Sequence, residues 1–93
     1  MNIFSLCDGR HDMPACVQGS IFGNSVDPTD IDGLQMVADR FIGDLAVDSV
    51  AVYVTGLTVA LVAVINACHK NKVKLTLMHF NRATGDYMPQ VVM

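Results

Sequence analysis

The chain has 93 residues and a net charge of −3 at pH 7, from six basic and nine acidic side chains, and every acidic residue is Asp. A chain of this length forms one small domain, residues 1–93, because it buries only roughly 60 to 65% of its unfolded surface and has too little core to divide. The acidic balance excludes the broad positive field that long nucleic acids need. Apolar residues make up 52% of the chain, so we expect a homodimer that covers part of this surface.

Cysteine usage and hydropathy indicate a cytoplasmic protein without a membrane span. Cys7, Cys16 and Cys68 are an odd number, and residues 1–12 (MNIFSLCDGRHD) have no basic region of the kind that opens a secretory leader. Residues 49–68 are uncharged and just long enough to cross a bilayer. A Thr-Gly pair interrupts this run and β-branched residues precede it, which favours a buried strand followed by a buried helix.

Residues 1–27 predict a strand and a long loop. Residues 1–6 are mostly apolar and predict a strand that ends at Cys7-Asp8-Gly9. Residues 8–27 contain four Gly or Pro residues. We expect a loop there, with a short strand or hairpin between 15 and 22, where two apolar islets occur.

Residues 27–43 predict an amphipathic helix. Asp27 and Pro28 are the residue types favoured at the N-cap and at the first helical position. Gly43 is expected to end the helix. The apolar stripe that recurs at steps of three and four residues consists of Ile31, Leu34, Val37, Ala38, Phe41 and Ile42.

Residues 50–71 predict a strand, a tight turn at Thr55-Gly56 and an apolar helix. Thr58 is expected to be the N-cap and Asn71 a left-handed C-cap. Small and polar side chains follow one side of this helix, and their spacing predicts close packing against a symmetry-related copy. They are Ala63, Asn66, Ala67 and Lys70.

Residues 73–92 predict an antiparallel hairpin. A strand over 73–80, a turn over 81–86 and a returning strand over 87–92 follow from the alternation of polar and apolar residues. Pro89 has no N–H to donate, so the last strand belongs at a sheet edge.

The order strand, long loop, helix, strand, helix, strand, strand predicts an α/β fold. We expect a small Rossmann-like domain with a mainly parallel sheet and a C-terminal antiparallel hairpin. The carboxyl ends of parallel strands share one rim, where open α/β sheets bind ligands. Residues 7–11, 55–58 and 80–84 are expected to meet there.

The turn between the central strand and the second helix is a candidate anion site. A helix that begins there presents unpaired amides and a partial positive charge, and Gly56 permits close approach of a ligand. The alternatives are a plain capped turn without a ligand, and Arg10 paired with Asp8 or Asp12 instead of clamping a phosphate. The predicted ligand-binding residues are Cys7, Asp8, Gly9, Arg10, Thr55, Gly56, Leu57, Thr58 and Arg82.

No metal site and no cofactor is predicted. Cys7, His11 and Cys16 lack the paired spacing of a zinc site. A nucleophile pair of Cys7 and His11 needs an orienting third group that the sequence does not identify. Arg10 and His11 are the candidates for catalysis, and the missing Walker, G-x-G-x-x-G and G-x-S-x-G motifs argue against common hydrolases and dehydrogenases.

Residues 50–73 resemble the Rossmann-like ligand-binding domains of CRISPR-associated sensors, the CARF superfamily. In that family a hydrophobic strand runs into a Thr-Gly-Gly-Thr-Lys type turn and an apolar helix, and here the turn reads TGLTV from Thr55. Leu57 replaces the second Gly and Val59 the Lys, so an anion would rely on backbone amides and Thr hydroxyls. The resemblance implies a cyclic oligonucleotide of antiviral signalling, such as a cyclic oligoadenylate, bound across a homodimer axis.

Three functions remain open on this basis. The chain is a sensor or sequestering protein for the nucleotide, or a metal-independent ring nuclease that cleaves it, or an oligomeric assembly protein with no nucleotide ligand. In a ring nuclease the ligand's own 2′-hydroxyl attacks, so the protein holds it in line and stabilises the developing charge.

Overall fold

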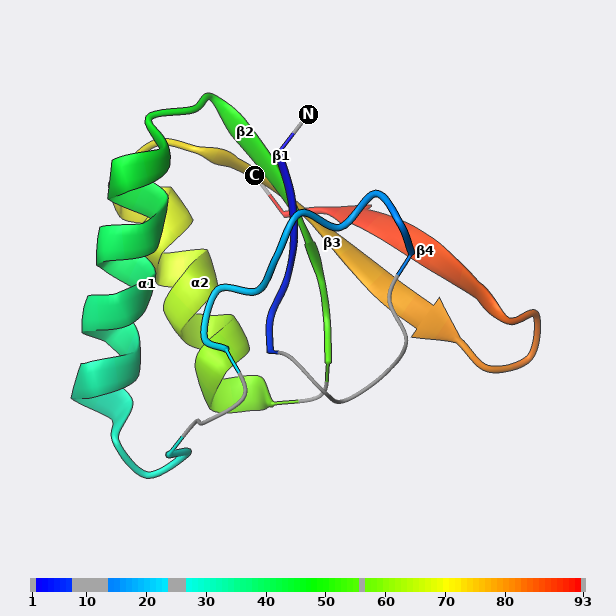
Figure 1. The fold of residues 1–93 in the computed structure, drawn as a ribbon, viewed down its shortest axis with the longest axis horizontal. Coiled ribbons are helices and arrows are strands. Elements are labelled where there is room, and N and C mark those ends of the chain that lie inside the picture. Colours follow the sequence, from blue (N-terminus) through cyan, green and yellow to red (C-terminus); the bar gives the residue numbers. More distant parts are fainter. Residues whose placement is uncertain (1, 8–13, 24–26, 56, 93) are drawn as a thin grey trace.

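The computed structural model describes residues 2–7, 14–23, 27–55 and 57–92. They form one four-stranded sheet and two helices (Figure 1). The elements are β1 (Asn2–Ser5), α1 (Ile31–Leu45), β2 (Ser49–Tyr53), α2 (Thr58–Lys70), β3 (Lys74–Asn81) and β4 (Asp86–Val91). Strands β1, β2 and β3 are parallel neighbours and β4 is antiparallel to β3. The predicted α/β class and element order are confirmed.

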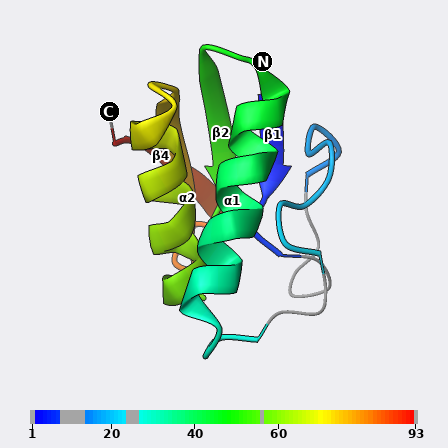
Figure 2. The same cartoon turned by 90° about the vertical axis from the view of Figure 1, so that its left-hand side faces the viewer.

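Both helices lie side by side against the same face of the sheet (Figures 1 and 2). Successive right-handed crossovers that move in one direction along a sheet place their helices on one face. The core between the layers takes alternate strand residues, and burial of this apolar area stabilises the fold. Its strand members include Phe4, Val50, Val52, Leu75 and Leu77, and its helix members include Leu34, Ala38, Ile42, Ala60 and Val64.

Helix α1 covers the side of α2 that the sequence suggested for a second copy. Ala63 and Ala67 are buried, and Gln35 of α1 donates through Nε2 to the Ala63 carbonyl at 3.0 Å. Lys70 Nζ lies 2.8 Å from Asp39 Oδ2. The prediction that this stripe packs against a symmetry-related copy is therefore wrong. Small residues allow close helix packing equally well within one chain.

The start and end of α1 also differ from the prediction. Asp30 is the N-cap and its Oδ1 accepts from Gly33 N at 3.0 Å. Asp27 instead closes a turn, because its Oδ1 accepts from the amide and the hydroxyl of Thr29. The helix runs past Gly43 to Leu45, because Leu45 still packs on the core.

Helix α2 begins one residue earlier than predicted. Leu57 occupies the N-cap and Thr58 is the first helical residue, so Thr58 does not cap the helix. At the other end Asn71 has φ −92°, and the left-handed residue is Lys72 at φ +58°. Asn71 stabilises the end differently, since its side chain donates to the Ala67 carbonyl at 2.9 Å.

Residues 17–22 run along the outer edge of β1 and pair with it. Ser5 N donates to the Gly19 carbonyl at 2.8 Å, and Ile21 N donates to the Ser5 carbonyl at 3.0 Å. A parallel bridge joins Ser5 to Ser20. The expected short strand between 15 and 22 is present as this single bridge.

Strand β4 is the last strand at the other side of the sheet, as Pro89 predicts. Val92 N donates to the Leu75 carbonyl at 2.9 Å. Hydrogen-bonded pairs alternate along an antiparallel ladder, so Gln90 and Met88 direct their backbone groups to β3. Pro89 lies between them and faces outward, where its missing N–H interrupts the free edge.

The described helices include none that is both long and apolar enough to cross a membrane.

Candidate anion site at the β2–α2 turn

The carboxyl ends of β1 and β2 adjoin at one rim of the sheet. Leu6 N donates to the Tyr53 carbonyl at 3.1 Å, so the residues that follow each strand begin at the same level. Cys7 is buried on the β1 side and Thr55 on the β2 side. Helix α2 begins three residues after Thr55, which places its amino terminus at this rim (Figure 1).

Thr55 has a buried hydroxyl that makes no hydrogen bond to the part of the chain that the structure describes. The residue is 4% exposed. Its Oγ1 lies at the rim and has no hydrogen-bond partner among the described residues. A buried hydroxyl left unpaired costs about 1 to 3 kcal/mol. Such a group calls for an explanation, and a bound molecule that completes the hydrogen bonding is one.

The first turn of α2 has no side-chain cap. Leu57 at the N-cap makes no side-chain hydrogen bond, and the first turn contains no acidic residue. The first intrahelical bond runs from Leu61 N to the Leu57 carbonyl at 3.0 Å. The amides of the first turn therefore keep their capacity to bind an anion, and the helix dipole favours negative charge there.

The predicted site residues fall into three groups. Thr55, Leu57 and Thr58 are together at the turn, and Cys7 follows the adjacent strand. Arg82 is exposed in the β3–β4 hairpin, which projects away from the helices and the start of α2 (Figure 1). The structure therefore does not bring Arg82 to the turn. Asp8, Gly9, Arg10, His11 and Gly56 lie outside the described residues.

Carboxylates cluster at the end of the molecule where the helices begin, whereas the opposite end has three lysines together with Asp44 and Asp48. Asp27, Asp30 and Asp32 gather at the start of α1, which lies at the same end of the molecule as the start of α2 (Figure 2). Lysines 70, 72 and 74 lie at or after the end of α2. Within the described residues, the dipole and first-turn amides of α2 favour an anion at the turn. The carboxylates at the start of α1 oppose it. Binding there requires short local hydrogen bonds.

The described thiol and phenol groups with shifted pKa values are poor nucleophiles. Burial raises the pKa of the Cys68 thiol to about 11. Burial also raises the pKa of Tyr53, and its hydroxyl lies 3.8 Å from Cys16 Sγ. Among the described residues, no three His, Cys, Asp or Glu side chains are grouped to hold a metal ion.

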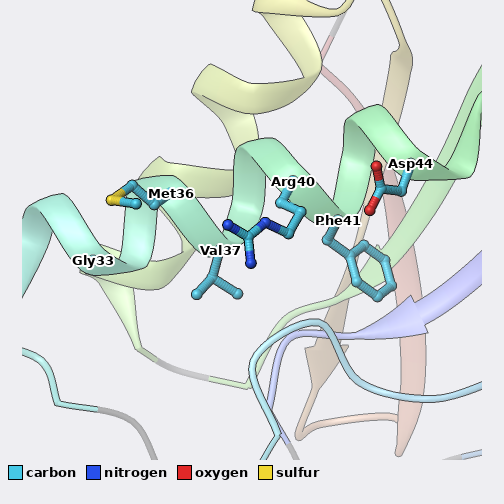
Figure 3. Close-up of a pocket in the computed structure, with 6 residues that line it drawn as sticks. All are labelled: Gly33, Met36, Val37, Arg40, Phe41 and Asp44. Atoms are coloured by element: carbon cyan, nitrogen blue, oxygen red, sulfur yellow. The ribbon is translucent and has the colours of Figure 1, made fainter.

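Two hollows flank α1, and one of them reaches the turn. The outer face of α1 has a cavity of about 370 Å³, where Arg40 extends between Val37 and Phe41 (Figure 3). The groove between α1 and α2 has a volume of about 380 Å³ and is lined by Thr58 at the start of α2 and by Asn66 two turns later. Reasoning from sequence missed this groove, because it depends on which helix covers α2. The feature of the sequence that pointed toward the groove was the row of polar residues at helical spacing along α2.

Comparison of the chain with protein-family models, with curated protein sequences and with solved structures gave no match. The function is therefore inferred from the site.

Proposed function

We propose that the protein binds a small phosphorylated nucleotide, with a phosphate at the β2–α2 turn. The unpartnered Thr55 hydroxyl carries this proposal. A phosphate oxygen would accept from this hydroxyl and from the first-turn amides of α2, which satisfies both sets of donors at once. Less than 1 Å² of the Thr55 Oγ1 atom is exposed, so binding requires the cover over the turn to open.

The ligand class proposed is a cyclic oligonucleotide held between two copies of the chain. The order of hydrophobic strand, Thr-Gly turn, apolar helix, strand and hairpin over 49–91 supports the resemblance to the sensor domains. Exposed large apolar residues support a homodimer. They include Met36, Val37, Phe80 and Val91. We propose binding rather than hydrolysis, because the sequence identifies no positioned general base.

The same exposed apolar residues favour a second function, an assembly protein without a nucleotide ligand. Val91 is 75% exposed and Met36 64%, and exposed apolar side chains that form a contiguous patch mark a surface for a partner. In this case the Thr55 turn is structural and binds no anion.

Titration of the full chain with cyclic dinucleotides and cyclic oligoadenylates, followed by calorimetry and thermal denaturation, separates these functions. A nucleotide-binding protein gains stability with the logarithm of the ligand concentration above its Kd. Chromatography of the mixture then shows whether the ligand is released intact or as linear products. A stable oligomer that binds no member of the panel contradicts the nucleotide proposal.

Thr58→Val is the matched test of the turn. Thr58 is exposed and is not the cap, so the substitution should change the free energy of unfolding by less than about 0.5 kcal/mol. We expect weaker nucleotide binding, since one hydroxyl beside the phosphate is lost. Unchanged affinity would place the phosphate elsewhere.

A further inference from the structure

We propose that the outer face of α1 packs against the same face of a second copy of the chain, with Arg40 of each copy paired to Asp44 of the other. The residues that line this face all belong to α1, and none of them belongs to the β2–α2 turn. The inference therefore goes beyond the proposed nucleotide site and does not depend on it.

An apolar hollow of about 370 Å³ lies on the outer face of α1 (Figure 3). Met36 is 64% exposed and Val37 46%. A second helix laid along the hollow would remove these side chains from water, which favours association. The lining residues recur at steps of three and four, which places them on one side of the helix. They are Gly33, Met36, Val37, Arg40, Phe41 and Asp44.

The same face contains a cation and an anion that are unpaired within the described residues. Arg40 and Asp44 are four residues apart, about one helical turn, and both are exposed. Neither side chain takes part in an ion pair or a hydrogen bond with the described part of the chain. The basic residue precedes the acidic one, which is the less favourable order for a pair within one helix. Both groups are therefore open to a partner.

The position of Asp44 favours a cation from outside the chain. Asp44 lies in the last turn of α1, and this turn contains no basic residue. A carboxylate there faces the negative end of the helix dipole, which is unfavourable. A guanidinium that a second copy placed beside Asp44 would offset both negative charges.

These two charges make the face complementary to itself. In a two-fold contact in which Arg40 reaches Asp44 of the second copy, Asp44 necessarily reaches Arg40 of that copy. The two helices are then antiparallel, and the apolar side chains of both copies meet across the hollow. Exposed ion pairs add little affinity, but they select the partner and fix its register. A second copy already has both charges at the required one-turn spacing.

The contact should be weak and separate from any ligand site. One pair of short helices buries less than the roughly 1,200 Å² of a standard interface, so we expect association that depends on protein concentration. Helices α1 and α2 begin at the same end of the molecule (Figure 2). Antiparallel pairing therefore puts the two β2–α2 turns at opposite ends of the pair, and a ligand shared between copies would use a different contact.

The test is sedimentation equilibrium of the full chain over a range of concentrations, with charge-reversed variants. We expect Arg40→Asp and Asp44→Arg each to weaken self-association about tenfold, because each variant places like charges opposite one another. An equimolar mixture of the two variants should associate as the wild type does, since every facing pair then has opposite signs. Lys72→Asp is the matched control for the change in net charge, because Lys72 is exposed and does not line the hollow.

Recovery of association in the mixture would support the inference, and it also shows that both variants are folded. A wild-type chain that stays monomeric at every concentration would overturn it. Single variants that associate as tightly as the wild type would overturn it as well. A mixture that stays dissociated would overturn the pairing of Arg40 with Asp44. Nucleotide binding by Arg40→Asp should equal that of the wild type, so failure of the proposed function and failure of this contact are measured separately.

Discussion

The two helices begin at the same end of the molecule, but their first turns are completed in opposite ways. Helix α1 supplies its own anion, since Asp30 accepts from Gly33 N and Asp32 lies in the first turn. Helix α2 has Leu57 at the corresponding position and an unpartnered Thr55 hydroxyl before it. At the start of α1 the Asp30 carboxylate already accepts the hydrogen bond that a phosphate would accept. At the start of α2 a phosphate would supply the missing acceptor. The contrast supports the proposal that an external anion binds at the start of α2.

Thr55→Val should have the largest effect. It should raise the stability of the protein and lower its affinity for the nucleotide. Removal of an unpaired buried hydroxyl with little change of volume should raise the free energy of unfolding by about 1 kcal/mol. Nucleotide affinity should fall by tenfold or more, because a hydrogen bond to a charged oxygen is lost. Denaturant unfolding and calorimetry measure the two effects, and Thr55→Ser serves as the control that keeps the hydroxyl. A variant that is both more stable and binds normally would make Thr55 irrelevant to the ligand.

Asp30→Ala should destabilise the protein by about 1 kcal/mol, the usual cost of a lost N-cap. Gly33→Ala should have a similar effect, because a β-carbon at Gly33 would clash with the Asp30 carboxylate and displace it. Denaturant unfolding of both variants and of the double variant measures this effect. If the two changes act through the same cap, the double variant is no less stable than the worse single one.

Thr55 and Leu57 show how far the sequence could predict this contrast. The strand, turn and helix follow from local periodicity, and the turn residues were named as ligand contacts from the sequence. That the Thr55 hydroxyl has no partner among residues 2–7, 14–23, 27–55 and 57–92 is a tertiary fact, because it depends on which side chains and backbone groups surround it. Likewise Asp27 and Asp30 are both good caps by residue type, and the Thr29 contacts decide that Asp27 closes a turn instead.

The packing of α2 was less predictable for a different reason. An apolar helix with small residues at regular spacing predicts a close partner, but periodicity contains no information on whether that partner is in the same chain. Here α1 takes the place, with Gln35 on the Ala63 carbonyl and Asp39 on Lys70. The groove at Asn66 follows from this packing, so it too was beyond prediction from sequence.

Lowering the pH should alter the start of α1 and spare that of α2. The hydrogen bonds from the Thr29 hydroxyl and amide hold the pKa of Asp27 below its ordinary value of 3.8. A lowered folded-state pKa contributes stability above 3.8, and this stability is lost as the pH falls through the lowered value. NMR titration should show the Thr29 amide shifting below pH 3.8 while Val59 and Ala60 stay constant. Thr29→Ala should move the Asp27 midpoint upward, and an unchanged midpoint would rule out this cause.

The smallest expected effect is that of Asp32→Asn. Asp32 is exposed at the start of α1 and faces no described cation, so its charge weakens anion binding at the neighbouring helix start. We expect about a twofold gain in nucleotide affinity at low salt, and none at 1 M salt, where screening is strong. Calorimetry at two salt concentrations measures this. Asp48→Asn, at the opposite end beside β2, is the matched control.

The outward-facing Pro89 has a consequence for behaviour at high concentration. Growth of amyloid-like fibres requires an uninterrupted row of donors onto which the next molecule can be laid. On β4 this row is broken at its middle position, and residues 17–22 already cover the corresponding row on β1. Despite its apolar surface, the folded protein should therefore remain free of fibres.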